Sequence, residues 1–347
     1  MRASLVSRLA ALVTLLPLVA ACGDGDEPAP PSGWVDVPGM VCADGSPTGI
    51  GISPGTENGV LVFLSGGGAC WSETECDASP GPFGSAEYQL LSAFVSGTIF
   101  DRTLPGNPFA SWTLVFVPYC TGDVHAGDSE QDYGTAGRWR HHGRANLEAA
   151  LEEVAATLPV PDKVVIAGSS AGGFGSLLAF DVLRARWPSG GAEAAQAYLL
   201  DDSGPTLVGD DLPPTLRSAW WASWNLAATV TPLCAACAAD LSEIWTTLSE
   251  GHPQDRFALL TTTRDATMRG FFGGMDAAPF EAAIGALTAK LGGLAGGNAA
   301  SFTVGGADAE DHALLVSPVA YSAGGTALLG WLELLVTDDP AWTSVGP

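Results

Sequence analysis

The sequence has few basic residues. Its 347 residues include 14 Lys and Arg against 38 Asp and Glu, which gives a formal net charge of -24 at pH 7. Such a surface repels the phosphates of nucleic acids and the headgroups of anionic lipids. We therefore exclude nucleic acid as a partner, and a strongly polyanionic substrate is disfavoured for the same reason.

The sequence also lacks, beyond its N-terminal region, an apolar run long enough to cross a bilayer. The apolar stretch Leu9–Ala21 is too short to span one, follows Arg2 and Arg8, and ends in small residues before Cys22. This pattern predicts a signal peptide over residues 1–21. Cys22 resembles the lipidated cysteine of bacterial lipoproteins, and an ordinary secreted protein is the alternative. Either way we expect an exported protein, at the cell surface, periplasmic or secreted, with membrane contact only through an N-terminal lipid.

No internal repeat is visible, and the organisation that follows the signal is simple. Residues 22–32 are rich in Pro, Gly, Asp and Glu, a composition typical of a flexible tether. Residues 33–347 have the length of one α/β domain, and 47% of the whole sequence is apolar, which is ample for a core. We therefore expect one domain after the tether.

Six cysteines remain when Cys22 is set aside, an even number in a protein that we expect to be exported. Disulfides are the favoured interpretation, and the sequence does not choose among the fifteen connectivities. A CxxC spacing within Cys234–Cys237 can indicate metal or redox chemistry, but one such pair without nearby histidines favours a structural bridge. The other four are Cys42, Cys70, Cys76 and Cys120.

Short apolar runs alternate with helical patterns along the chain. Runs of this kind, without strict polar alternation, indicate buried strands of a mostly parallel sheet with helices on both faces. The expected class is therefore an α/β-hydrolase-type fold, with a helical, Trp-rich insertion over residues 212–249. The expected strands are Val60–Leu64, Thr113–Pro118, Lys163–Ala167, Ala197–Leu200, Phe257–Thr261 and Ser301–Val304, and helices are expected at Ala145–Leu158 and Ala171–Trp187.

The sharpest local signal is Gly168-Ser169-Ser170-Ala171-Gly172. A lone GxSxG is weak evidence, but this one lies directly after an expected strand and before an expected helix. A nucleophile elbow requires that context, because the tight turn lifts the serine hydroxyl above the sheet. Ser170 is therefore the candidate nucleophile, and the amide of Ala171 is one candidate oxyanion donor.

The other oxyanion donors should follow an earlier strand. Ser65-Gly66-Gly67-Gly68-Ala69 follows Val60–Leu64, and we assign the amides of Gly67 and Gly68 to this role. A glycine-rich loop can instead hold phosphate. No Lys-Ser/Thr follows these glycines, which disfavours a nucleotide site.

The base must be a histidine, and in this fold it follows the acid, which follows the serine. His312 alone comes after the last expected strand, whereas His252 precedes the fifth strand and His125, His141 and His142 precede the nucleophile.

Asp265 follows the fifth strand by a short polar step and is the expected acid. Its task is to hold the imidazole in one tautomer. The competing acids are Asp201, Asp202, Asp240, Asp308 and Asp311.

Three blocks of the sequence resemble the pectin acetylesterase/Notum family of carboxylesterases. They are the glycine loop through Cys70-Trp71, the segment Pro118–Gly127 with its Pro-Tyr-Cys motif, and the elbow with its extra Gly173. The chain departs from the family in carrying Ala69 after the glycines, where the family often has Trp or Tyr. The likeness is strongest over residues 60–180.

The resemblance implies a serine esterase that needs no metal or cofactor and removes small O-acyl groups, such as O-acetyl groups of a polysaccharide, or else a lipid acyl group. Trp71, Asp123 and His125 are candidate substrate contacts, with ordering of a loop as the alternative for Asp123 and His125. Trp220, Trp221 and Trp224 form either a substrate-binding wall or core. Two further functions stay open: a lipase or polyester-type hydrolase on the same fold, and a non-catalytic, surface-tethered binding protein.

Overall fold

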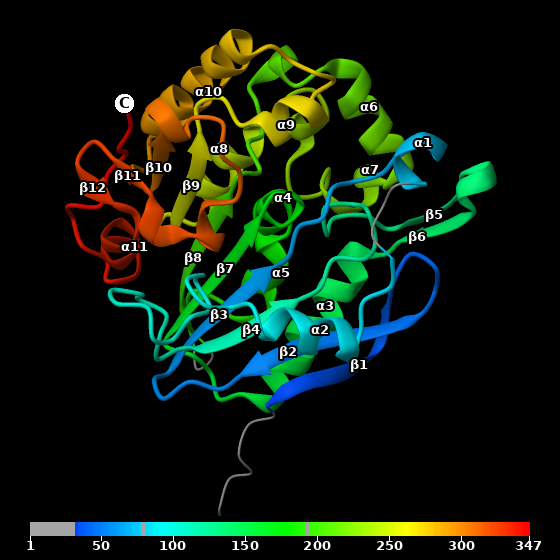
Figure 1. The fold of residues 1–347 in the computed structure, drawn as a ribbon, viewed down its shortest axis with the longest axis horizontal. Coiled ribbons are helices and arrows are strands. Elements are labelled where there is room, and N and C mark those ends of the chain that lie inside the picture. Colours follow the sequence, from blue (N-terminus) through cyan, green and yellow to red (C-terminus); the bar gives the residue numbers. More distant parts are fainter. Residues whose placement is uncertain (1–31, 78–80, 192–193) are drawn as a thin grey trace, which may run out of the picture.

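The computed structural model describes residues 32–77, 81–191 and 194–347. Their central feature is an eight-stranded sheet in the order β1-β2-β4-β3-β7-β8-β9-β10 (Figure 1). Six strands of this sheet, β4, β3, β7, β8, β9 and β10, run parallel to one another, whereas β2 is antiparallel to both β1 and β4. The bounds are Gly33–Val41 (β1), Pro47–Ser53 (β2), Gly59–Leu64 (β3), Thr113–Val117 (β4), Lys163–Ser169 (β7), Gln196–Asp202 (β8), Arg256–Thr262 (β9) and Ala299–Val304 (β10). The mostly parallel sheet confirms the predicted fold class.

Alternate residues of the central strands enter two separate cores, as a sheet covered on both faces requires. In β3, Val60, Val62 and Leu64 pack on one face, and Leu61 and Phe63 pack on the other. Helices bury the first face. The second is covered mainly by α11 and by the nonhelical stretch 99–112.

Eleven α-helices lie in the described residues, and they surround the sheet in Figure 1. Helices α3, α5, α8 and α10 contribute to the first core, and α11 contributes to the second. The bounds are Glu73–Cys76 (α1), Ser85–Ser92 (α2), Gly143–Thr157 (α3), Ala171–Leu178 (α4), Phe180–Arg186 (α5), Pro214–Ser223 (α6), Leu226–Thr229 (α7), Glu243–Gly251 (α8), Ala266–Phe271 (α9), Ala277–Gly292 (α10) and Leu328–Val336 (α11). Small two-stranded sheets pair Ser129–Asp132 (β5) with Arg138–His141 (β6), and Ser322–Ala323 (β11) with Thr326–Ala327 (β12).

The helix expected over residues 171–187 is instead two helices, which meet at Ala179. The backbone of Ala179, at φ -123° and ψ 19°, has left the helical region. Three of the eight residues of α4 are glycines, which stabilise a helix less than other residues do. The break lets α4 pack under the elbow while α5 turns to pack against α3.

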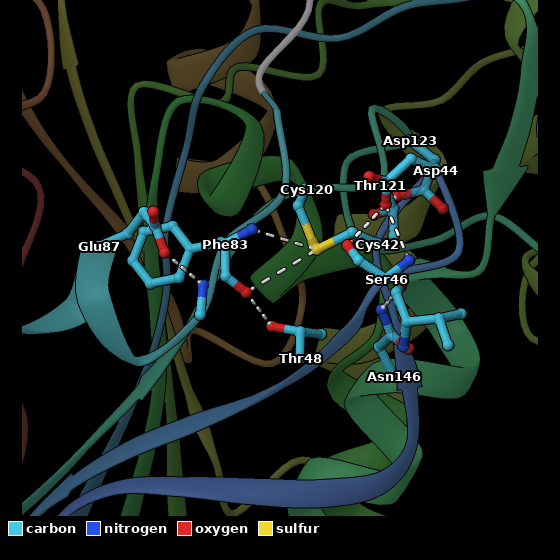
Figure 2. The surroundings of a disulfide bond; sticks show 12 residues. Cys42, Asp44, Ser46, Thr48, Phe83, Glu87, Cys120, Thr121, Asp123 and Asn146 are labelled. Atoms are coloured by element: carbon cyan, nitrogen blue, oxygen red, sulfur yellow. Dashed lines mark hydrogen bonds between the residues drawn. A yellow bond between two sulfur atoms is a disulfide. The ribbon is translucent and has the colours of Figure 1, made fainter.

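All six cysteines that were expected to pair do so. The bonds are Cys42–Cys120, Cys70–Cys76 and Cys234–Cys237, which confirms the disulfides and the structural interpretation of the CxxC spacing. The first closes a separation of 78 residues, and a chain-entropy estimate gives such a loop about 4 kcal/mol of stabilisation. Figure 2 shows that it fastens the end of β1 to the segment that carries Thr121 and Asp123.

The predicted signal peptide and Cys22 lie outside the described residues, as does the tether apart from Ser32. Among the helices of the described ranges, none is long and apolar enough to cross a membrane.

Candidate active site

Ser170 occupies a strained turn between β7 and α4. Its backbone has φ 60° and ψ -120°, a region that L-residues rarely adopt. The neighbouring glycines are required by close packing: a Cβ at Gly168 would lie 2.1 Å from the Gly172 carbonyl oxygen, and one at Gly172 would lie 1.9 Å from that of Leu64. The GxSxG spacing therefore gives the tight strand-to-helix turn that an exposed nucleophile needs.

The glycine loop lies directly against this turn. A Cβ built on Gly66 would lie 2.9 Å from the Ser170 Cβ and 3.4 Å from the Ala171 nitrogen. Gly68, at φ +86°, adopts a conformation that favours glycine. The loop and the first amide of α4 thus meet beside Ser170, where the sequence predicts the oxyanion donors.

His312 and Asp265 are brought together by loops that follow β10 and β9. The His312 Nδ1 donates to the Asp265 Oδ2 at 2.7 Å, because a carboxylate can only accept. The side chain of Asp265 is fully buried, and its Oδ1 accepts from the Met268 amide at 2.9 Å as the N-cap of α9. The cap fixes the carboxylate, the carboxylate fixes the imidazole, and His312 keeps its Nε2 available.

Ser170 and His312 line the same cavity of about 620 Å³. Gly67 and Gly68 also line it, so the candidate nucleophile, base and oxyanion loop share one space. The remaining walls are almost wholly apolar and come from β3, β4, the stretch 88–100 and α9. They include Phe63, Ile99, Phe100, Leu114, Phe116 and Phe271.

Asp202 connects the elbow to the histidine loop. Its carboxylate accepts from the Ser169 Oγ at 2.6 Å and from the Leu314 and Leu315 amides at 2.9 and 3.0 Å. Its carbonyl oxygen accepts from the Ser170 amide at 2.7 Å. Burial raises the pKa of this carboxyl, and the hydrogen bonds and His312 oppose that shift. Asp202, weighed in the sequence only as a competing acid, therefore positions both halves of the site.

Asp123 and His125 are too buried to contact a substrate in this cavity. Asp123 is fully buried and accepts from the Thr121 hydroxyl and the His125 and Gly143 amides. The His125 Nε2 donates to the Ser65 carbonyl at 2.9 Å, and burial lowers its pKa. We therefore correct the hypothesis that Asp123 and His125 line the mouth of the cavity. They instead order the loops beneath the glycine loop, which was the alternative.

Trp71 packs against the Trp-rich insertion rather than lining the main cavity. Its ring lies 5.9 Å from that of Trp220 and 6.3 Å from that of Trp224, and these two stack at 5.2 Å. The Trp224 Nε1 donates to the Cys70 carbonyl at 2.7 Å. Trp220 and Trp224 are buried and Trp221 is partly buried, so this cluster is core that docks the insertion onto the glycine loop.

The remaining histidines have partners of their own. His141 is buried between Tyr133 and the Thr121 carbonyl, and His252 lies 3.9 Å from Asp255. In the described ranges, His, Cys, Asp and Glu do not gather into a group of three suited to a metal ion.

Sequence reasoning missed Asp202 as a positioning residue and the apolar wall from residues 88–100. A signal existed for the position of Asp202, though not for its contacts, since it ends β8, which pairs with β7, and Ser170 directly follows β7. No comparable signal in the sequence indicated that residues 88–100 form an apolar wall of the cavity.

Comparisons with known proteins agree with this fold and identify a family. A sequence model of the family described as Pectinacetylesterase matches residues 35–230. Pectin acetylesterase 5 of Arabidopsis thaliana is 28% identical over 211 residues, which are 58% of this chain and 48% of that protein. Human palmitoleoyl-protein carboxylesterase NOTUM is 30% identical over 179 residues, 48% of this chain and 34% of that protein. The matches thus span about half or less of the length of these curated relatives.

The crystal structure of the Wnt deacylase Notum from Drosophila superposes with a TM-score of 0.63 at 16% identity, covering 90% of this chain and 97% of that one. This likeness supports the fold alone. The family match covers more than half of the chain and includes the glycine loop, the Pro-Tyr-Cys segment and Ser170. The chain therefore belongs to the pectinacetylesterase family.

Proposed function

We propose that this protein is a serine carboxylesterase in which Ser170, His312 and Asp265 form the catalytic triad. The observation that carries the proposal is that Ser170 and His312 line one cavity while Asp265 holds the far nitrogen of the imidazole. The strained turn at Ser170 and the adjoining glycine loop supply the two other parts that acyl transfer needs.

In the proposed reaction the Ser170 Oγ attacks the ester carbonyl while the His312 Nε2 takes the hydroxyl proton. The amides of Gly67, Gly68 and Ala171 stabilise the oxyanion, each by about 3 kcal/mol. His312 returns the proton to the leaving alcohol, and an acyl-enzyme remains. Water then attacks the acyl-enzyme by the same route, releasing the acid and restoring Ser170. Asp265 stabilises the imidazolium at each stage.

The cavity favours an acyl group longer than acetyl. Acetyl would fill a small fraction of about 620 Å³, whereas an alkyl chain can cover the apolar side chains of Ile99, Leu114 and Phe116. We therefore place medium or long acyl esters ahead of the O-acetyl esters that the resemblance implies. Among acetylated carbohydrates, a neutral polymer is preferred over pectin, because the chain is strongly acidic.

Export is part of the proposal. Three disulfides bind all six cysteines of the described part of the chain, and such bonds persist in oxidising compartments. A lipid on Cys22 would then hold the enzyme at a membrane.

The test is hydrolysis of p-nitrophenyl acetate, butyrate and octanoate by the parent, Ser170→Ala and Ile99→Phe. We expect Ser170→Ala to lose the activity of the folded parent. Ile99→Phe narrows the cavity and should lower kcat/KM for octanoate about 10-fold, with a smaller effect on acetate. A parent that is folded but no faster than Ser170→Ala would leave the tethered binding protein as the better hypothesis. Equal effects of Ile99→Phe on all three esters would contradict the acyl-binding role of the cavity.

A further inference from the structure

Exposed apolar side chains gather on two segments that also contribute to the cavity wall. Among the described residues six large hydrophobic side chains are exposed, and five of them come from the stretches 90–94 and 316–319. We call these five the apolar rim: Leu90, Leu91, Phe94, Val316 and Val319. Phe94 and Leu90 are 69% and 67% exposed, which is costly in water unless another apolar surface covers them.

The apolar rim is continuous with the cavity wall. Leu91, Phe94 and Val316 are exposed and also line the cavity, so its apolar surface extends outward through its mouth. Both segments contribute to the wall of one cavity, and the Ile99 amide, close to the first segment, donates to the Leu315 carbonyl beside the second at 3.0 Å. Helix α2, which carries Leu90 and Leu91, has no buried residue. The rim is therefore an outward-facing surface of the site and not an edge of the core.

The segments that carry the rim have few charged residues for an acidic protein, although Glu87 lies one turn before Leu90 in α2. Residues 88–100 and 313–332 contain no Asp, Glu, Lys or Arg, although 15% of the chain is charged. A surface of this kind is not built to attract an ionic partner, and the rest of the molecule repels an anionic one. The lack of charged residues in the rim segments suits contact with an uncharged apolar surface.

We propose that the apolar rim docks on the surface of aggregated neutral esters, such as droplets of an uncharged glyceride, and feeds acyl chains from that surface to Ser170. This inference rests on the proposed esterase function and adds how the substrate is presented. Docking would remove Leu90 and Phe94 from water and place the open mouth of the cavity against the ester surface. Docking leaves the chemical steps of the reaction unchanged and raises the effective concentration of substrate at Ser170.

The experiment compares two butyrate esters, tributyrin as an emulsion and p-nitrophenyl butyrate in solution. The test variant is Leu90→Ser/Val319→Ser, because both side chains belong to the rim and neither lines the cavity. The control is Val160→Ser. Val160 is the sixth exposed hydrophobic and precedes β7, at the end of the sheet opposite to Ser170.

We expect the double variant to lose about 10-fold in turnover of the emulsion and to keep its rate on dissolved p-nitrophenyl butyrate, while Val160→Ser keeps both. Binding is measured separately with Ser170→Ala, which should float with triolein droplets coated with phosphatidylcholine. That binding should be lost when the two rim substitutions are added.

Unchanged emulsion turnover and flotation in the double variant would overturn the inference while leaving the esterase intact. A parent that hydrolyses neither ester would instead refute the proposed function, whatever the flotation result. If sedimentation shows a dimer of the parent that the double variant does not form, the rim is an interface between copies of this chain, and the docking proposal is wrong.

Discussion

Two histidine–aspartate pairs lie in the loops around the elbow, and their surroundings suit different roles. In the first, His312 has a side chain that is 20% exposed, gives one ring nitrogen to Asp265 and keeps the other available in the cavity. In the second, His125 is 2% exposed and its Nε2 donates to the Ser65 carbonyl, while Asp123 binds a hydroxyl and two backbone amides. A proton-transfer pair needs an unoccupied nitrogen beside the substrate, whereas the second pair uses its hydrogen bonds to hold backbone groups and a hydroxyl in place.

We expect the largest difference in activity between the two pairs when each histidine is replaced by glutamine. His312→Gln removes the proposed base and should lower kcat/KM about 10⁴-fold without changing the fold, as loss of a triad member does. His125→Gln keeps an amide donor for the Ser65 carbonyl and should lower it by less than about 10-fold. Steady-state hydrolysis of p-nitrophenyl butyrate measures both. Similar losses in the two variants would mean that the roles are not distinct.

Replacing each aspartate by asparagine should separate activity from stability. Asp265→Asn keeps an oxygen that can cap α9. Its NH₂ group either faces His312 or leaves the imidazole in the wrong tautomer, so we expect kcat to fall about 10³-fold with little change in the free energy of unfolding. Asp123→Asn sets an NH₂ group against one of the amides that the carboxylate now accepts. It should lower the free energy of unfolding by about 1–3 kcal/mol. Urea unfolding beside initial rates gives both quantities, and a stable, inactive Asp123→Asn would reverse the assignment.

The smallest expected effect is on the pH dependence of stability. Burial lowers the pKa of His125, and of His141, below the ordinary value of about 6.5. As pH falls below that value the unfolded chain takes up protons that the folded chain excludes, so stability falls by up to about 1.4 kcal/mol per pH unit for each histidine. His125→Gln removes the contribution of one histidine to this dependence of the free energy of unfolding on pH. Urea unfolding between about pH 7.5 and 5.5 should show a shallower decline in His125→Gln than in the parent, and parallel declines would contradict the buried, neutral state of His125.

The central strands could be predicted because they are buried on both faces and so appear as uninterrupted apolar runs, such as Thr113–Val117. The edge strand β1 and its neighbour β2 could not be predicted, since β1 is partly exposed and β2 alternates glycine with isoleucine. Helix α10 was also missed, because its many alanines and glycines give only a weak amphipathic pattern.

The candidate site shows a similar division. The order of Ser170, Asp265 and His312 along a known type of sheet was enough to predict that the last two meet, and the structure brings them to 2.7 Å. The Asp202 contacts join backbone amides more than 110 residues away, and nothing local in the sequence encodes such a contact. The sequence placed Asp123 beside His125 in one motif without revealing that folding buries both.

Covalent labelling with a fluorophosphonate ester tests the account most directly, because the reagent reacts with a serine that an adjacent base has activated. We expect mass spectrometry to find the adduct on Ser170 in the parent and in His125→Gln, and labelling to disappear nearly completely in His312→Gln and Ser170→Ala. An unlabelled but folded parent, or equal labelling of the parent and His312→Gln, would contradict the proposal that Ser170 is a nucleophile activated by the His312–Asp265 pair.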